Sequence, residues 1–349
     1  MNFIFKFNIS TNMNAGKRYN PLEFAIWTRR TILFCFLIST IPVLVFFFLK
    51  WGFLSIPWQP IAVLGTAVAF IVGFKNNASY NRLWEARQIY GGIINDSRSF
   101  AVKARDFLQD HETPAVIHKI FDRHFAWLTF LRYQLREPRV WETLSGKQSQ
   151  EYMEGRYKVP EWTEKLEDSV APYLSKTELD QLLSKKNRAS QVLAVQSAHL
   201  NELCKAGAIT ELQQLQLQQS ISSFYDQQGK AERIKNFPYP RHFSSITTYL
   251  LHIFVYLLPF GLLKECAAIG AGTALEGYSV FLLIPLTTLI AWVFITLDAV
   301  GENSLNPFEG GANDVPITQI SKMIETDLKE MLDRKDLPEP IVPVNNILM

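Results

Sequence analysis

The chain has 349 residues, of which 48% are hydrophobic, 13% aromatic and 19% charged. Its 35 basic and 33 acidic residues leave a net charge of +2, which argues against the electrostatic binding of nucleic acid. Cys35 and Cys266 lie in or beside apolar stretches and Cys204 lies in a polar region, so we expect neither a disulfide nor a metal site.

The apolar residues are clustered, although a mean hydropathy of +0.03 is compatible with a soluble protein. A helix needs about 20 predominantly apolar residues to cross a bilayer. Four stretches approach or exceed this length, at residues 31–54, 54–74, 243–263 and 278–297. The sequence therefore predicts a membrane protein with four transmembrane helices.

The charge distribution predicts the orientation of these spans. Before the first span, Glu23 is the single acid among five basic residues: Lys6, Lys17, Arg18, Arg29 and Arg30. By the positive-inside rule this end lies in the cytoplasm, and the links at 50–57 and 264–277 lie outside. The first thirty residues show no signal-peptide pattern. With four spans, both termini are expected in the cytoplasm.

The second apolar stretch continues without a turn signal into polar sequence, so we expect one helix that leaves the membrane and extends into water. Residues four apart share one face of a helix, and two stripes have this spacing. Small residues that allow close helix packing form one stripe: Gly65, Ala69 and Gly73. The stripe beside it consists of Thr66, Phe70 and Phe74. Such a helix suits the lining of a narrow pore.

The polar region at 75–242 is expected to be helical nearly throughout. Two capping boxes predict helix starts, one at Ser175 with Glu178 and one at Thr210 with Gln213. We find no strand alternation of useful length. The region therefore supports an all-α fold.

Prolines at 236–240 are expected to end these helices ahead of the third span. After the fourth span we expect a loop at 306–311, a short amphipathic helix and a loose tail over the last fifteen residues. Membrane and cytoplasmic parts then share long helices. We divide the chain into four segments: 1–74 with spans one and two, 75–242 as the cytoplasmic helical region, 243–297 with spans three and four, and 298–349 as the C-terminal loop, helix and tail.

Two motifs make the chain similar to a known family. The first is GFKNNASYNRLWEARQIYGGIINDSRSFA at 73–101, and the second is Asn-Pro-Phe at 306–308 followed by Ala-Asn-Asp-Val-Pro at 312–316. With the order of spans and the helical insert, they resemble the bacterial branch of the bestrophins over nearly the whole chain. The resemblance implies a cyclic pentamer around one central pore. Animal bestrophins are calcium-activated anion channels, whereas bacterial relatives include cation-conducting ones.

The resemblance also implies where the pore narrows. The family's neck has three hydrophobic positions on the second span, which fall on Thr66, Phe70 and Phe74. A ring too narrow and apolar to hold water is a barrier to ions. Thr66 departs from the usual bulky apolar residue, so the outer ring should be wider or wetter. A second constriction, low in the cytoplasmic part, falls on Tyr239.

The calcium clasp of the animal branch is a run of acids, because calcium takes six to eight oxygen ligands. Here Gly310 and Gly311 stand where acids are expected, so we predict no calcium requirement and no metal site. A weak cation site is the minority alternative. It would gather four side chains: Glu302, Asn303, Asn306 and Asp314.

Several polar residues near the second span have two interpretations. Asn76, Asn77 and Ser79 either hydrate ions below the neck or cross-link helices, and both are left open. Ion pairs are the expected structure for two groups: Arg82 with Glu85 and Arg87, and Asp96 with Arg98.

Two ionisable residues belong to the later spans, where such groups are functional candidates. We favour a neutral imidazole that is hydrogen-bonded between helices for His252, and a bond to a neighbouring helix for Asp298. His118 and His124 are six residues apart, so they do not share a helix face and make no zinc pair.

These observations predict a homopentameric bestrophin-type channel in the bacterial inner membrane, conducting anions such as chloride and gated by hydrophobic rings. Its partners are other copies of the chain, permeant inorganic ions and membrane lipid. A monovalent-cation channel of the same fold is the close alternative, since apolar rings do not determine charge selectivity. A non-conducting membrane scaffold is a second alternative. No catalytic motif is present, so we expect neither an enzyme nor a cofactor.

Overall fold

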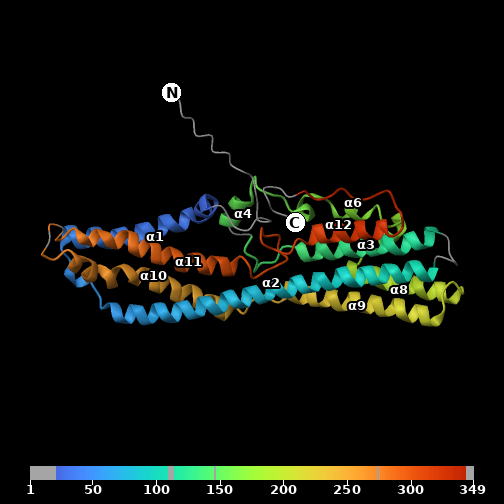
Figure 1. The fold of residues 1–349 in the computed structure, drawn as a ribbon, viewed down its shortest axis with the longest axis horizontal. Helices are drawn as coiled ribbons and strands as arrows, with labels where there is room; N and C mark the ends of the chain where they lie inside the picture. The colour runs from blue at the N-terminus through green and yellow to red at the C-terminus, as the bar shows by residue number, and fades with distance from the viewer. Residues whose placement is uncertain (1–20, 109–113, 145–146, 273, 275, 343–349) are drawn as a thin grey trace, which may run out of the picture. The chain divides into compact units, whose positions relative to one another are not determined.

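The computed structural model describes residues 21–108, 114–144, 147–272, 274 and 276–342 (Figure 1). Within these ranges the regular structure consists of α-helices and two short 3₁₀ turns, without strands. Four helices are long and apolar enough to cross a membrane. They are α1 (Pro21–Leu49), α2 (Trp58–Leu108), α10 (Arg241–Ile269) and α11 (Leu283–Glu302). The all-α class and the four candidate spans are confirmed.

The third long helix extends beyond its apolar stretch. The third helix was expected to end near residue 263, but α10 continues through Lys264 and Glu265 to Ile269. Charged side chains at a helix end do not stop a helix, because its backbone hydrogen bonds continue regardless of the polarity outside. Three basic residues that contribute to the expected orientation lie outside the described residues: Lys6, Lys17 and Arg18. So does the end of the expected tail, at 343–349.

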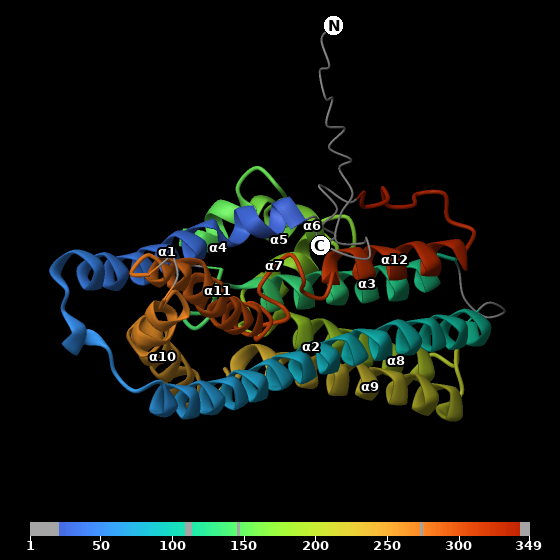
Figure 2. The ribbon, with the colours of Figure 1, turned by 60° about the vertical axis from the view of Figure 1, so that its left-hand side comes forward.

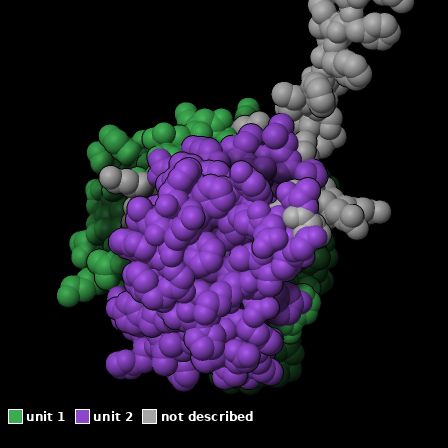
Figure 3. Space-filling model, turned by 90° about the vertical axis from the view of Figure 1, so that its left-hand side faces the viewer, with its two compact units in different colours: residues 1–17, 82–237, 306–349 green, residues 18–81, 238–305 purple. Residues whose placement is uncertain are grey.

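The chain divides into two compact units (Figure 3). We call residues 21–81 with 238–305 the membrane unit, since they contain the apolar parts of all four long helices. We call residues 82–237 with 306–342 the insert unit. Helix α2 contributes to both units, so the segment boundary expected at 74 falls inside a continuous helix.

In the membrane unit, α1 packs along α11 and α10, and α10 packs along α11 (Figures 1 and 2). Val68 and Val72 of α2 form a core with Phe254 and Val255 of α10. Gly65 allows this contact, because a Cβ atom at that position would lie 2.7 Å from the Phe254 ring. Small residues let membrane helices approach in this way.

The insert unit is a helical bundle centred on α3 (Pro114–Arg136), which packs against α8, α9 and α12. Figures 1 and 2 show α12 alongside α3. The other helices are α4 (Lys147–Met153), α5 (Pro160–Thr163), α6 (Leu166–Val170), α7 (Lys176–Leu183), α8 (Arg188–Lys205), α9 (Glu211–Asn236) and α12 (Ile317–Glu330). The expected C-terminal helix is therefore present as α12.

Both predicted helix starts are confirmed. Ser175 accepts a hydrogen bond from the Glu178 amide at the start of α7. At α9, Thr210 and Gln213 form the complete reciprocal capping box. Each cap satisfies amides that the helix itself leaves without an acceptor.

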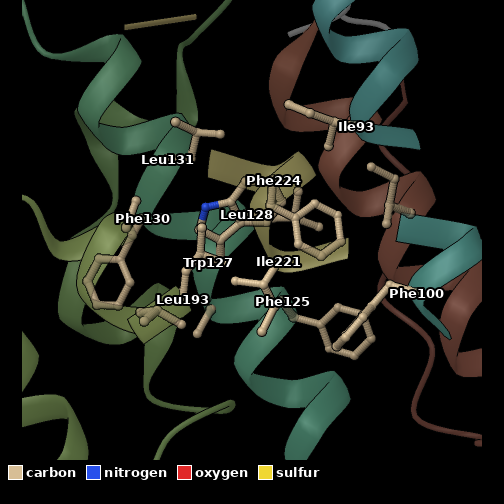
Figure 4. Packing of buried hydrophobic residues seen from close by; sticks show 14 of the residues in the cluster. Ile93, Phe100, Phe125, Trp127, Leu128, Phe130, Leu131, Leu193, Ile221 and Phe224 are labelled. Atoms are coloured by element: carbon tan, nitrogen blue, oxygen red, sulfur yellow. The ribbon is translucent and has the colours of Figure 1, made fainter. Parts of the chain in front are cut away.

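An aromatic cluster fills the core of the insert unit (Figure 4). The rings of Trp127 and Phe224 lie 4.8 Å apart, and the Trp127 indole donates to Gln228 Oε1 at 3.0 Å. His124 packs on the same Phe224 ring at 4.7 Å and contacts Ser97 Oγ at 2.9 Å. Burial lowers the pKa of His124 to about 3, so this imidazole is neutral at physiological pH. His124 is thus a core residue.

The expected ion pair between Asp96 and Arg98 is wrong. Asp96 accepts hydrogen bonds from Ser223 at 2.6 Å and from Gln227 at 3.3 Å, both on α9. Arg98 instead pairs with Asp327 of α12. Residues two apart on a helix point in different directions, so they bond to different neighbours.

Two residues of the expected ion-pair network, Arg82 and Glu85, both bond to α9. Glu85 pairs with Arg233 near the end of α9, and Arg82 donates to the Ile234 carbonyl at 2.9 Å. Two neighbouring turns of α2 are therefore attached to the last turn of α9.

Candidate ion pathway

One face of α2 is exposed along its apolar half, while the opposite face is buried. Phe70 and Phe74 are 64% and 69% exposed, and Thr66 is exposed as well. Val68 and Val72, on the other side, are buried in the core of the membrane unit. The predicted stripe therefore lies on the surface of a single chain.

The exposed stripe contains one residue that the sequence analysis missed. Val63 is 72% exposed and lies seven residues before Phe70, which places it two helical turns away on the same face. Val63 does not fit the strict four-residue spacing of Thr66, Phe70 and Phe74. A combined three- and four-residue spacing would have included Val63.

The hydroxyl of Thr66 is engaged within its own helix. Its Oγ1 donates to the Ala62 carbonyl at 3.0 Å, a common arrangement for threonine in a helix. Because that proton is used, Thr66 presents a less polar surface than a free hydroxyl would. The outer position of the stripe is thus smaller than phenylalanine and only modestly polar.

The same face of α2 becomes polar beyond Phe74. Asn77, Asn81 and Gln88 are exposed, at seven-, eleven- and eighteen-residue intervals from Phe70, which keeps them close to the line of the stripe. Each carboxamide offers both N–H donors and a carbonyl acceptor. An ion passing along this face would leave an apolar surface and meet groups able to replace part of its hydration.

A buried ion cluster lies directly after the apolar stripe. Lys75 is 1% exposed, and its Nζ lies 2.9 Å from Asp298 Oδ1 and also pairs with Glu302. Both acids belong to α11, one helical turn apart. The expectation that Asp298 bonds to a neighbouring helix is confirmed.

A close backbone approach accompanies this ion cluster. Ser79 Oγ donates to the Gly301 carbonyl at 2.8 Å. A Cβ atom at position 301 would lie 2.1 Å from Asn76 Oδ1, so a larger residue there would displace the Asn76 side chain. Ser79 thus cross-links α2 to α11, whereas Asn77 is exposed. The cross-linking interpretation is therefore confirmed for Ser79, and ion hydration by Asn77 stays a prediction.

The small-residue stripe also has buried and exposed members. Gly65 is buried against Phe254, whereas Ala69 and Gly73 are exposed, and a Cβ atom at Gly73 would meet nothing within 4 Å. Within one chain only Gly65 serves helix packing. The other two leave the surface beside the aromatic residues open.

Two further candidates lie on or before α10. Tyr239 precedes the helix and belongs to the membrane unit, with its ring 6.3 Å from that of Phe243. Its expected role as a second constriction stays a prediction. Nδ1 of His252 lies 2.7 Å from the Thr248 carbonyl, so its hydrogen bond is within its own helix and not between helices.

Residues 25–330 match the Bestrophin_2 family, described as bacterial/fungal bestrophin protein. The chain belongs to the bestrophin family. It is 27% identical over 284 residues to the voltage-dependent anion channel-forming protein YneE of Escherichia coli K12, covering 81% of this chain and 80% of YneE. A protein of the same description from Ralstonia nicotianae is 24% identical, with 80% and 78% covered. Bestrophins are channels and not enzymes.

Solved structures show the same fold. A bacterial bestrophin homologue from Klebsiella pneumoniae superimposes with a TM-score of 0.73 at 20% sequence identity. The match covers 88% of this bestrophin and 98% of the Klebsiella chain. The multi-pass, all-helical architecture is therefore that of a bestrophin.

Side chains of the alternative cation site have other partners in this bestrophin. Glu302 pairs with Lys75, and the Asn303 amide donates to the Ala299 carbonyl at 2.8 Å. The carboxylate of Asp314 accepts from the backbone amides of residues 310 and 311, at 2.7 and 2.8 Å. Among the described residues, no group of three or more acidic, histidine or cysteine side chains is arranged to hold a metal ion.

The loop after α11 instead carries two buried carboxyl groups. Glu309 is 1% exposed and accepts from the amide and the hydroxyl of Thr143, at 2.9 and 2.6 Å. Burial raises the pKa of Glu309, and the nearby Asp314 raises it further. Burial also raises the pKa of Asp314, although Arg136 Nη1 lies 3.6 Å away. Both carboxyl groups of the loop therefore bind a proton more readily than exposed ones do.

Replacing Lys75 by Met is expected to destabilise the protein by about 3–5 kcal/mol, because two acids would lose their buried counter-ion. The melting temperature of the detergent-solubilised protein measures this loss. Arg87→Met removes an exposed cation from the same helix and should have little effect. Adding Asp298→Asn to Lys75→Met should recover part of the stability. If Lys75→Met melts like Arg87→Met, the ion cluster does not stabilise the fold.

The raised pKa of Glu309 predicts how stability depends on pH. The folded state binds a proton at Glu309 more tightly than the unfolded state does. The stability that this proton contributes is therefore present at low pH, and it is lost as the pH rises past the ordinary carboxyl range. Glu309→Gln should therefore lose less stability than the wild type between about pH 5 and about pH 9. Melting temperatures across this range test it, with the exposed Glu330→Gln as control. Parallel curves for the wild type and Glu309→Gln would refute the prediction.

Proposed function

We propose that this protein is a bestrophin-type channel that conducts anions along an axis lined by the exposed face of α2. The observation that carries the proposal is the surface stripe of Val63, Thr66, Phe70 and Phe74, opposite a packed face of the same helix. The relatives named as anion channel-forming proteins support the anion as the permeant species.

The length of α2 distinguishes its exposed face from one that only contacts lipid. Its 51 residues correspond to about 76 Å of helix, against about 30 Å for the hydrocarbon core of a bilayer. Contact with lipid explains an exposed apolar face only within the bilayer. Here the same face continues with exposed carboxamides at Asn77, Asn81 and Gln88, as expected for a path along which ions leave the apolar segment.

A channel requires several copies of the chain, because one exposed helix face cannot enclose water. Copies related by cyclic symmetry would direct their α2 faces toward a common axis. The exposed Ala69 and Gly73 favour this arrangement, since small residues beside the aromatic stripe let neighbouring helices approach. We propose a homopentamer, the assembly implied by the family, with lipid covering the outward apolar surfaces of the other spans.

In such a ring, Phe70 and Phe74 would form two successive aromatic constrictions. A narrow apolar ring excludes water and thereby opposes the passage of any hydrated ion. Thr66 would form a wider outer ring, and Tyr239 a further narrowing below. Gating would then consist of widening or wetting the aromatic rings.

Charge selectivity must arise outside these rings. Lys75, the cation nearest the neck, is buried and paired with Asp298 and Glu302, so it offers little positive potential to the pore. The carboxamides beyond the neck can face an anion with N–H or a cation with C=O. Anion preference therefore depends on the potential of the wider assembly.

We further propose that the protein lies in the bacterial inner membrane with both termini in the cytoplasm. Arg29 and Arg30 at the start of α1, and Arg82 and Arg87 beyond the second span, support this orientation through the positive-inside rule. A green fluorescent protein fused to the C-terminus would fluoresce only if that end is cytoplasmic.

The reversal potential of the purified protein in a planar bilayer under a KCl gradient tests the function. We expect it near the chloride equilibrium potential. Native mass spectrometry first establishes that an intact oligomer is present. A reversal near the potassium potential would replace the proposal with a cation channel, and the absence of current from an intact oligomer would favour a non-conducting scaffold.

The double substitution Phe70→Ala with Phe74→Ala is expected to raise single-channel conductance or open probability, because it removes both aromatic rings. Phe36→Ala provides a matched control, since Phe36 is an exposed phenylalanine on α1. Single-channel recording compares the three proteins. Unchanged currents from a folded double variant would exclude these side chains from the gate.

A further inference from the structure

The insert unit contains a polar cavity of about 740 Å³ that the ion pathway does not use. It lies where the end of α3, helix α5, the turn between α7 and α8, and the end of α9 meet. Its volume is in the range of small-molecule sites. It is far larger than a chloride ion requires, so its shape suits a larger solute.

Basic side chains outnumber acidic ones in the lining of this cavity. The basic residues are Arg136, Arg139, Lys185, Lys186, Arg188 and Lys235, and the acidic residues are Glu137, Glu161 and Glu232. An excess of positive charge in a recess of low dielectric constant raises the local concentration of anions. The cavity therefore favours an anionic occupant.

Protein partners neutralise only part of this basic set. Arg139 pairs with Glu137 at 3.1 Å, and Lys235 pairs with Glu142. Three neighbouring cations around Asn187 form no ion pair within the described part of the chain: Lys185, Lys186 and Arg188. We call these three residues the basic turn. They are the charges available to a ligand.

Two guanidinium groups have donors without acceptors. Arg188 is half-buried, and its buried Nε has no hydrogen-bond partner. Arg136 is 1% exposed, and its Nε and Nη1 lack hydrogen bonds, with Glu161 and Asp314 only at 3.9 and 3.6 Å. A buried N–H without an acceptor is costly. A ligand oxygen in the cavity would reduce that cost at Arg188.

The start of α8 adds a smaller electrostatic contribution. Asn187 caps the helix by accepting from the Ser190 amide at 3.1 Å, and Gln134 accepts from the Ala189 amide at 3.3 Å. These amides are therefore already used. The helix still places partial positive charge at this end, which favours an anion beside it. Direct contacts to a ligand would come from side chains.

Aromatic groups complete the lining. The Trp162 indole donates to the Arg136 carbonyl at 2.9 Å, which fixes the ring at the cavity wall. Tyr133 lines the same cavity, and its hydroxyl is bonded to Ser169 at 2.7 Å. These surfaces can contact the uncharged part of an organic anion.

We propose that this cavity binds a small, multiply charged anion of the phosphate type, held by the basic turn at Lys185, Lys186 and Arg188. Arginine matches phosphate oxygens with two parallel N–H groups, and lysine adds point charge. The site is separate from the stripe on α2, and its occupant is a bound ligand and not the permeant ion.

Calorimetric titration of the purified full-length protein with inorganic pyrophosphate tests this site. We expect saturable binding that weakens with salt. The variant Lys185→Gln/Lys186→Gln/Arg188→Gln should lose at least about tenfold in affinity, as expected for charge-assisted hydrogen bonds. Lys205→Gln, an exposed cation at the other end of α8, should bind like the wild type.

A second variant distinguishes a loss of binding from a loss of folding. Lys185→Gln/Lys186→Gln changes only exposed side chains, so it should keep the melting temperature and still weaken pyrophosphate binding. No saturable binding, or equal affinity in the wild type and both variants, would overturn the proposal. Citrate binding as tightly as pyrophosphate would overturn the phosphate assignment. The titration requires no ion current, so its outcome is independent of the proposed channel function.

Discussion

The buried ion cluster of Lys75 with Asp298 and Glu302 is the constraint on which the membrane unit depends. Removing the Lys75 ammonium and most of the Asp298 carboxylate from water is costly unless they are paired at short distance. The cluster therefore fixes the position of α11 along α2. Glycine at 301 and the Ser79 hydrogen bond then bring the two backbones together beside it. This attachment sets which face of α2 is covered and which is left exposed.

The covered and exposed faces of α2 differ in their side chains. Aliphatic residues such as Val68 and Val72 pack against α10, whereas the aromatic residues of the stripe are largely exposed. Large side chains on the surface of a membrane protein are satisfied by lipid or by other copies of the chain. The carboxamides that continue the face outside the apolar segment favour the second explanation.

Charge is distributed differently in the insert unit. Most buried ions there have a counter-ion from a distant part of the sequence, as in the pair of Arg132 with Glu161 at 2.6 Å. The basic turn differs, since its two exposed lysines and half-buried arginine line a cavity in which basic side chains outnumber acidic ones. Cations gathered in the lining of a recess favour an anion from outside the chain. The excess of basic over acidic side chains distinguishes the cavity from an ordinary packing defect.

The sequence alone determined what depends on local spacing. Apolar length marked the four spans, capping residues marked the starts of α7 and α9, and helical periodicity placed Thr66, Phe70 and Phe74 on one face. The motifs also identified the family. Such features depend on helix geometry over a few turns, which a single segment carries by itself. Only the tertiary structure decided the partners of Lys75, Asp96 and Arg98, the unit to which Tyr239 belongs, and the cavity beside the basic turn. Each of these unites residues far apart along the chain, and their distances follow from packing that no local pattern encodes.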